Sequence, residues 1–226
     1  MKRSVVLLSS GLDSTVNLYE ARTKSQVVLA LTIDYGQRAA QSELEQAALI
    51  AKHAGVPHQT LSLPWFSQFT QTALINRSAE VPVKADISID DLAVSQTSAK
   101  AVWVPNRNGI LLNIGAGFAE GLGADWIVPG FNIEEGTTFP DNTQEYLDAL
   151  TNAFRYSTGN KTEVICFTTH LNKTEIVRRG QELGVPFDLI WPCYFAGDEP
   201  CGDCESCQRF NRATRAAGVM VSRSAR

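Results

Sequence analysis

The sequence predicts an α/β protein with a five-stranded parallel sheet, helices on both faces of the sheet and a small cysteine-bearing segment at the C-terminus. Apolar, β-branched runs alternate with segments of helical periodicity along most of the chain. Such alternation is typical of parallel strands joined by right-handed helical crossovers. The length of 226 residues favours one compact unit with an appendage over two full domains. We expect residues 1–190 to form the main domain and residues 191–226 the appended segment.

The first half of the chain repeats a strand–loop–helix unit. Short apolar runs predict the strands, and Gly- or Ser-containing turns separate them from helical patterns. The predicted strands are residues 4–8, 26–33 and 58–63, and the predicted helices begin at Leu12 and cover residues 39–53 and 65–74. The stretch 65–74 could instead be irregular, because it is short and rich in aromatic residues.

The second half begins with a long excursion at residues 76–105, where no period is sustained. Excursions of this length are often functional. Regular patterns then return, with Pro140 in the first turn of one helix and a capping-box pattern, Asn172 to Glu175, at the start of another. The predicted helices are residues 106–122, 140–156 and 173–184, and the predicted strands are 125–128 and 163–166.

Composition and charge exclude several classes of protein. The chain holds 20 basic and 24 acidic residues and has a formal charge of -4, so no global basic field exists to bind a polyanion. No stable nucleic-acid partner is expected. An uninterrupted apolar run of about 18 residues is absent from the sequence, as is the apolar core of a signal peptide. We therefore expect a soluble, cytoplasmic protein without a membrane partner.

The loop Ser9-Ser10-Gly11-Leu12-Asp13-Ser14-Thr15 is the most specific local signal, because it joins the first strand directly to the first helix. Small residues allow main-chain N–H groups to converge on an anion, and the helix start adds the positive end of its dipole. The pattern lacks the Gly-Lys-Ser/Thr of a Walker A loop and the three-glycine dinucleotide fingerprint. It predicts a phosphate cradle in which Asp13 coordinates Mg²⁺ or orients the loop, the alternative being an ordinary helix cap.

The cysteine cluster has the spacing C-x7-C-x2-C-x2-C over Cys193, Cys201, Cys204 and Cys207. Four thiolates can form a closed tetrahedral Zn²⁺ shell with no open position, so we expect one structural zinc ion per chain. Redox-active cysteines and an iron–sulfur cluster are the competing interpretations. Cys166 lies in an apolar, strand-like run and is expected to be a buried hydrophobic residue.

Several motifs together resemble one family. The loop after the first strand is similar to the pyrophosphate loop (PP-loop) of the N-type ATP pyrophosphatases, whose fold is adenine nucleotide alpha hydrolase-like. Further along the chain come four other motifs and then the cysteine cluster. These motifs occur in the order expected of one family, and as a set they resemble those of the 7-cyano-7-deazaguanine synthases, the QueC family. The motifs are Asp34-Tyr35-Gly36-Gln37-Arg38, Val104-Pro105-Asn106-Arg107-Asn108, Gly130-Phe131-Asn132 and Phe139-Pro140-Asp141.

The resemblance implies an ATP-dependent ligase that joins 7-carboxy-7-deazaguanine and ammonia in queuosine biosynthesis, with Mg²⁺ accompanying ATP. It implies Lys173 and Asp13 as catalytic residues and an ATP site formed by Leu8, Ser9, Ser10, Gly11, Leu12, Asp13, Ser14, Thr15, Val16, Asn17 and Leu18. Substrate contacts are expected from Arg38, Arg107, Asn108, Asn132 and Asp141. An acidic acceptor such as Asp141 suits the adjacent N–H donors of a guanine-like amidine.

The sequence also departs from the family pattern. Ser10 stands where many relatives have glycine, and serine should be tolerated there if the residue keeps a negative φ. Asn106 stands within the familiar Pro-Gly-Arg-Asn, and Phe139 to Thr143 differ from the usual Tyr-Pro-Asp-Cys-Arg. This last difference lies in the expected substrate pocket, so a related PP-loop enzyme that adenylates another carboxylate or tRNA is the alternative.

Two features remain open at this stage. After Glu205 the chain carries five arginines and no acid, which predicts a solvated helix with a frayed end or, as the alternative, a grip on tRNA or an anionic substrate. The Gly- and Ala-rich helix from Asn106 could pack against another subunit, so a homodimer is compatible with the sequence. A zinc-stabilised binding module without catalysis is the non-enzymatic alternative.

Overall fold

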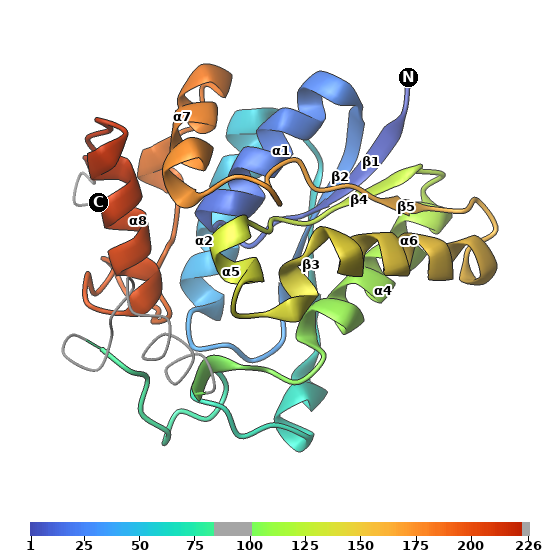
Figure 1. The fold of residues 1–226 in the computed structure, drawn as a ribbon. Coiled ribbons are helices and arrows are strands. Elements are labelled where there is room, and N and C mark those ends of the chain that lie inside the picture. Colours follow the sequence, from blue (N-terminus) through green and yellow to red (C-terminus); the bar gives the residue numbers. More distant parts are fainter. Residues whose placement is uncertain (84–100, 223–226) are drawn as a thin grey trace.

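The computed structural model describes residues 1–83 and 101–222, which form an α/β fold around one parallel sheet. Within these residues the sheet has five strands in the order β3-β2-β1-β4-β5 (Figure 1). The predicted sheet is thereby confirmed. The strands are β1 (Arg3–Leu7), β2 (Gln26–Asp34), β3 (His58–Ser62), β4 (Trp126–Val128) and β5 (Glu163–Val164).

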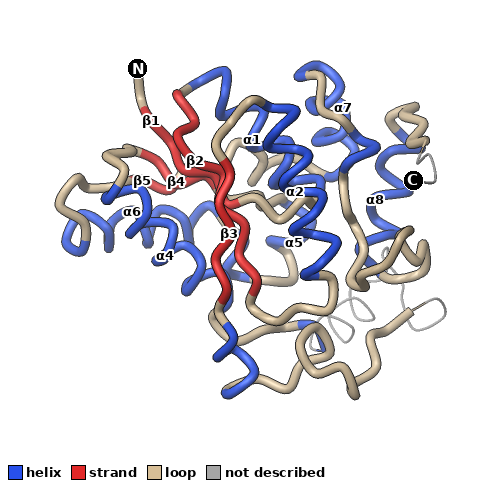
Figure 2. The backbone as a smooth tube through the Cα atoms, turned by 180° about the vertical axis from the view of Figure 1, so that it is seen from behind, coloured by secondary structure: helices blue, strands red, loops and turns tan. Residues whose placement is uncertain are grey.

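Helices cover both faces of the sheet, as predicted (Figure 2). One apolar cluster joins the sheet to α4 and α6, and a second joins it to α1, α2, α7 and α8. The helices are α1 (Leu12–Lys24), α2 (Ala40–Ala54), α4 (Arg107–Gly121), α5 (Ile133–Gly136), α6 (Gln144–Ser157), α7 (Lys173–Leu183) and α8 (Glu205–Ala216), with short 3-10 helices at η1 (Pro64–Gln68), η3 (Pro140–Asn142) and η4 (Phe187–Leu189).

Two helix predictions were wrong in extent. The predicted helix 65–74 is only the 3-10 turn η1, because Pro64 starts it and the aromatic rings of Trp65, Phe66 and Phe69 pack on one another rather than along a helical stripe. The predicted helix from Pro140 is split into η3 and α6, since Thr143 caps α6 through its side chain. Residues 84–100, which are part of the predicted excursion, lie outside the described residues.

The C-terminal segment packs on the main fold rather than standing apart from it. Phe210 and Ala213 of α8 are buried in the same apolar cluster as α1 and α7. Figure 1 shows α8 beside α7, with α1 next to them. The division of the chain at residue 190 stays a prediction. Within the part that the structure describes, every helix is too short or too polar to span a bilayer.

Candidate active site

The sheet has a topological switch point between β1 and β4, because the chain proceeds outward from β1 to β3 and returns on the other side with β4 and β5. Ligands in such sheets bind beyond the carboxyl ends of the strands at this point. A cavity of about 290 Å³ lies there. Its walls come from the loops after β1 and β4, the starts of α4 and α7, the residues around Cys193 and helix α8. This volume is close to the lower end for small-molecule sites, roughly 300 Å³.

The loop after β1 forms one wall and presents an uncapped helix start. Its hydroxyls hold the loop in shape: Ser14 Oγ accepts from Ser9 N at 3.2 Å and donates to Gly11 O at 3.2 Å. Gly11, the N-cap residue of α1, has an extended backbone, and no side chain caps this helix in the described structure. Main-chain N–H groups and the helix dipole therefore remain available to an anion.

The predicted ATP-binding residues divide into two groups by position. Leu8, Ser9, Gly11, Leu12, Asp13 and Ser14 line the cavity. Val16 and Leu18 belong to the apolar core, and Asn17 joins α1 to the segment after β5, through a 2.6 Å hydrogen bond from its Nδ2 to Thr168 Oγ1. Thr15 is fully buried. Thr15, Val16, Asn17 and Leu18 thus hold the loop in place from the protein interior and do not line the cavity.

Ser10 has a positive φ of 60°, so the condition under which serine should be tolerated here, a negative φ, is not met. The residue is fully buried, and its Oγ has no hydrogen-bond partner among the described residues. Asn106, the other departure from glycine, also has a positive φ, of 51°. Asparagine tolerates this left-handed region better than serine does, so only Ser10 is both strained and unpaired.

Gly130 allows the loop after β4 to pack directly on the phosphate loop. A Cβ at this position would lie 2.3 Å from Ser14 N and 2.5 Å from Ser14 Cα. Both neighbours are main-chain atoms, which cannot rotate away. The close approach of the two loops across the switch point therefore requires glycine here.

Lys173 enters the cavity from the start of α7 and pairs with two carboxylates. Its Nζ lies 2.6 Å from Asp13 Oδ2 and 2.8 Å from Glu135 Oε1. Burial lowers the pKa of Lys173, but the two carboxylates outweigh burial and hold the pKa above that of a free lysine. Lys173 is thus a fixed cation beside the phosphate loop. The predicted capping box, Asn172 with Glu175, is present and starts α7 at this residue.

The two carboxylate oxygens of Asp13 differ: Oδ2 forms hydrogen bonds with other described residues, and Oδ1 does not. Oδ2 also accepts from Asn132 Nδ2 at 2.9 Å, whereas Oδ1 is buried without a hydrogen-bond partner in the described structure. Carboxylate oxygens are the protein ligands that Mg²⁺ prefers. An unpaired carboxylate oxygen beside the uncapped start of α1 has the chemistry of a Mg²⁺ ligand. Asn132 itself is fully buried and supports Asp13 rather than lining the cavity.

The opposite wall combines polar groups with flat aromatic rings. Arg107, Asn108 and Asp141 all line it, and Arg107 Nε donates to Asn108 Oδ1 at 3.2 Å. Asn108 Nδ2 is buried and makes no hydrogen bond of normal geometry to a described residue, although the Asn108 side chain lies near enough to the Asp141 carboxylate to lower its pKa. Burial raises the pKa of Asp141, and the guanidinium of Arg107 opposes this rise. Trp103 and Phe139 stack beside them with ring centroids 5.7 Å apart, an arrangement that the sequence did not indicate.

Arg38 is occupied elsewhere. Its guanidinium donates to three main-chain carbonyls, those of Ala73, Asn76 and Ala79, and Arg38 does not line the cavity. These bonds tie the start of the excursion to the loop after β2. The substrate contact expected of Arg38 stays a prediction.

Glu43 of α2 is a cavity-lining acid that sequence analysis missed. Its Oε2 accepts from Gln37 Nε2 at 2.8 Å, and Gln37 in turn accepts from Tyr35 N at 2.9 Å. Burial raises the pKa of Glu43 to about 7. The only sequence signal was its position in the first turn of a helix that follows the Asp34 motif.

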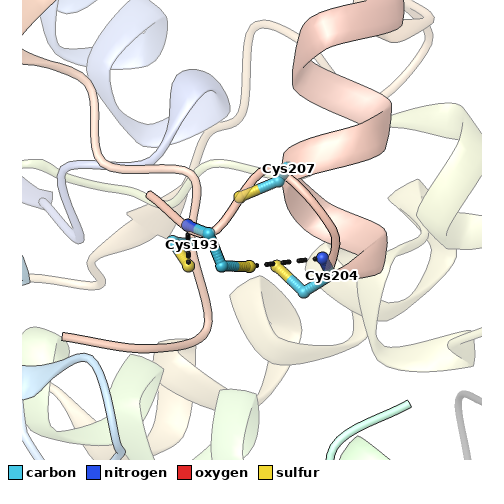
Figure 3. A group of neighbouring side chains, drawn as sticks. Cys193, Cys204 and Cys207 are labelled. Atoms are coloured by element: carbon cyan, nitrogen blue, oxygen red, sulfur yellow. Dashed lines mark hydrogen bonds between the residues drawn. The ribbon is translucent and has the colours of Figure 1, made fainter. Parts of the chain in front are cut away.

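The four predicted metal ligands come together near the cavity. The Sγ atoms of Cys193, Cys201, Cys204 and Cys207 lie within 4.8 Å of one another. Figure 3 shows three of these side chains turned toward a common point. Zn–S bonds of about 2.3 Å place the sulfurs of a tetrahedral site roughly 4 Å apart, so the cluster fits a zinc ion. N–H groups also reach the sulfurs, for example from Cys201 N to Cys193 Sγ at 3.3 Å.

Helix α8, which contains Cys207, brings an arginine into the cavity wall. The side chain of Arg209 is only 11% exposed, so the solvated helix face expected of this segment was wrong at this position. Arg209 Nη1 lies 3.2 Å from Glu134 Oε2, and its Nη2 lies 2.7 Å from Glu205 Oε1. Arg212 also pairs with Glu134. Nothing in the sequence indicated these partners.

Comparisons with known proteins agree with this geometry. The family model "Queuosine biosynthesis protein QueC" matches residues 3–218. A 7-cyano-7-deazaguanine synthase from Bdellovibrio bacteriovorus is 55% identical over 221 residues, covering 97% of this chain and 96% of the relative. One from Carboxydothermus hydrogenoformans is 48% identical, covering 94% and 98%. A solved 4-thiouridine synthetase bound to RNA and ATP has a TM-score of 0.54 at 16% identity, covering 96% of this chain and 50% of that one, and shares its fold.

Proposed function

The chain belongs to the QueC family of queuosine biosynthesis proteins, and from this premise we propose that it is an ATP-dependent ligase that converts 7-carboxy-7-deazaguanine and ammonia into 7-cyano-7-deazaguanine. The observation that carries the proposal is one cavity with an uncapped helix start and Lys173 on one side and Arg107, Asn108 and Asp141 on the other. One side suits a triphosphate, and the other suits a polar planar ring.

Activation of the acid comes first, because a carboxylate repels nucleophiles and oxide is a poor leaving group. The carboxylate oxygen attacks the α-phosphorus of ATP, and pyrophosphate leaves. The main-chain N–H groups of the phosphate loop and the ammonium of Lys173, which line the same cavity, would stabilise the charge that builds up on the departing pyrophosphate. Mg²⁺ held by Asp13 would neutralise phosphate charge. No protein nucleophile is required.

Recognition of the ring is assigned to the opposite wall. Asp141 accepts the adjacent N–H donors of the guanine-like edge, while the unpaired Nδ2 of Asn108 donates to the ring carbonyl. The stacked pair of Trp103 and Phe139 offers a flat apolar surface to the heterocycle. A buried donor and a buried acceptor penalise a ring that lacks the matching groups.

Nitrogen enters in the second stage. Ammonia attacks the acyl adenylate, AMP leaves with one oxygen of the original carboxylate, and a proton is released to give the amide. The amide oxygen then attacks a second ATP, and pyrophosphate leaves again. Loss of AMP with the remaining oxygen, together with the remaining nitrogen-bound protons, yields the nitrile. Two ATP molecules are consumed for each nitrile formed.

The metal and the compartment follow from the cysteines. One zinc ion per chain would anchor the segment around α8, because four cysteine ligands leave no open position for catalysis. A cluster of four cysteines that binds a metal rather than forming disulfides is typical of a reducing compartment, which supports a cytoplasmic location. The homodimer suggested by the sequence stays a prediction.

The proposal is tested by incubating the metal-loaded protein with ATP, Mg²⁺, ammonium chloride and 7-carboxy-7-deazaguanine and following the products by mass spectrometry. We expect the nitrile and about two AMP per nitrile. Turnover of ATP only when tRNA is added would instead support the alternative that the chain is a tRNA-modifying enzyme. ATP turnover with other carboxylates but not with this acid would contradict the substrate assignment.

A further inference from the structure

Glu134 joins two parts of the cavity wall that are far apart in the sequence. Its Oε1 accepts the main-chain N–H of Lys173 at 2.8 Å, at the first residue of α7. Its Oε2 accepts from Arg209 and Arg212 of α8. One carboxylate therefore connects the start of α7, which carries Lys173, to α8, which carries Cys207. Figure 1 shows these two helices side by side.

The α8 end of this connection is itself rigidly placed. Arg209 forks between Glu134 and Glu205, which lies one turn earlier on the same helix. Cys204 directly precedes α8, and Cys207 lies in its first turn, so the cysteine cluster fixes where the helix begins. The ion pair with Glu205, on the same helix, thus orients the Arg209 side chain toward Glu134.

The charges explain why Glu134 needs arginine partners. The ammonium of Lys173 already pairs with Asp13 and Glu135. Glu134 is adjacent in sequence to Glu135 and contacts the main chain of Lys173, so an uncompensated Glu134 carboxylate would compete for the same ammonium. Arg209 and Arg212 neutralise that carboxylate through Oε2, and Oε1 accepts from the main chain of Lys173.

We propose that Glu134 and Arg209 are positioning residues, which hold the start of α7 so that the Lys173 ammonium faces the phosphate loop. The inference rests on the role proposed above for Lys173 and adds what keeps that side chain in place. Neither residue is required to touch a reacting atom. A shift of about 1 Å in a catalytic group can cost roughly 100-fold in rate.

The test compares four variants of the metal-loaded protein. Glu134→Ala removes both oxygens, whereas Glu134→Gln keeps an oxygen that accepts from Lys173 N. Arg209→Lys cannot fork between two carboxylates. Arg215→Ala is the control, because Arg215 is an exposed residue of the same helix. For each variant the measurements are kcat, the KM for ATP, metal content and the hydrogen-exchange rate of the Lys173 amide.

We expect Glu134→Ala to lower kcat about 10- to 100-fold, to change the KM for ATP less than about threefold and to speed exchange at Lys173. Glu134→Gln should restore slow exchange and most of kcat. Arg209→Lys should lower kcat about three- to tenfold, and Arg215→Ala should match the parent. Metal content should stay the same throughout.

The inference is overturned if Glu134→Ala keeps the parental kcat, or if the Lys173 amide exchanges at the parental rate in that variant. Should Glu134→Ala not fold, Arg209→Lys decides through the same two readouts. Should the parent protein form no nitrile, the proposed function fails, and the exchange rates alone decide the positioning role.

Discussion

Two parts of the cavity wall, the phosphate loop and the segment around α8, are built in different ways. The phosphate loop, residues 9–15, is one continuous stretch in which the hydroxyls of Ser9 and Ser14 form hydrogen bonds within the loop. The α8 wall, residues 193–210, depends on four sulfurs and on an ion pair between Glu134 and Arg209, which are 75 positions apart. The loop combines its own hydrogen bonds with close packing and pairing from distant residues such as Gly130 and Lys173, whereas the α8 wall also requires a metal. Substitutions in these two parts should therefore have different effects on metal content, stability and ATP binding.

The largest effect is expected from loss of the metal. Cys204→Ser removes a ligand that is fully buried, so metal content should fall from about one per chain to near zero. The free energy of unfolding should fall by at least about 3 kcal/mol, because metal binding contributes directly to folding. Metal analysis and urea denaturation measure both. Cys166→Ser, at a cysteine outside the cluster, should keep the metal; full metal content in Cys204→Ser would refute the assignment.

A substitution on the loop side should act through packing instead. Gly130→Ala places a Cβ against the main chain of Ser14, so it should cost about 3 kcal/mol of stability and abolish detectable ATP binding while the metal stays bound. Gly117→Ala is the matched control, since a Cβ there meets nothing within 4 Å, and it should stabilise the chain by about 0.5–1 kcal/mol. Calorimetry of ATP binding and thermal unfolding compare the two, and equal stabilities would contradict the close approach.

A third, smaller effect is a pH dependence of the free energy of unfolding, which we expect Glu43 to cause. Burial raises the pKa of Glu43 from 4.5 in the unfolded chain to about 7. The folded state therefore holds this proton more tightly, and its contribution to stability is full below about pH 4.5 and is lost as the pH rises through about 7.

Glu43→Gln has no such proton to lose. Relative to the parent, its free energy of unfolding should rise by about 2 kcal/mol between pH 5 and pH 8. Urea denaturation across this range measures the difference. Glu45→Gln, on the exposed side of the same helix, serves as control. Parallel pH profiles for the parent and Glu43→Gln would show that Glu43 is not held in this way.

The smallest effect concerns the strained loop residue. Ser10→Gly removes a left-handed serine and a buried, unpaired hydroxyl, so it should stabilise the chain by about 1 kcal/mol without loss of ATP binding. Asn106→Gly should change stability by less than about 0.5 kcal/mol, because asparagine already tolerates a positive φ. Thermal unfolding separates the two. Destabilisation by Ser10→Gly would mean that its hydroxyl has a partner.

The same contrast explains what could be predicted from sequence. Strand positions, the capping box of α7 and the cysteine cluster depend on local patterns, and all three were predicted. The positive φ of Ser10 could not be predicted, because a motif gives residue types and not dihedral angles. Neither Glu134 with Arg209 nor Trp103 with Phe139 could be paired in advance, since each pair meets only through the tertiary fold.

The central claim is that this cavity makes a carboxylate reactive by adenylation. The most direct test supplies 7-carboxy-7-deazaguanine labelled with ¹⁸O at both carboxylate oxygens, together with ATP, Mg²⁺ and ammonia, and measures the label in the products by mass spectrometry. The account predicts that each nitrile formed is accompanied by two AMP molecules, each carrying one ¹⁸O from the acid. Unlabelled AMP, or ADP and phosphate in place of AMP and pyrophosphate, would contradict it.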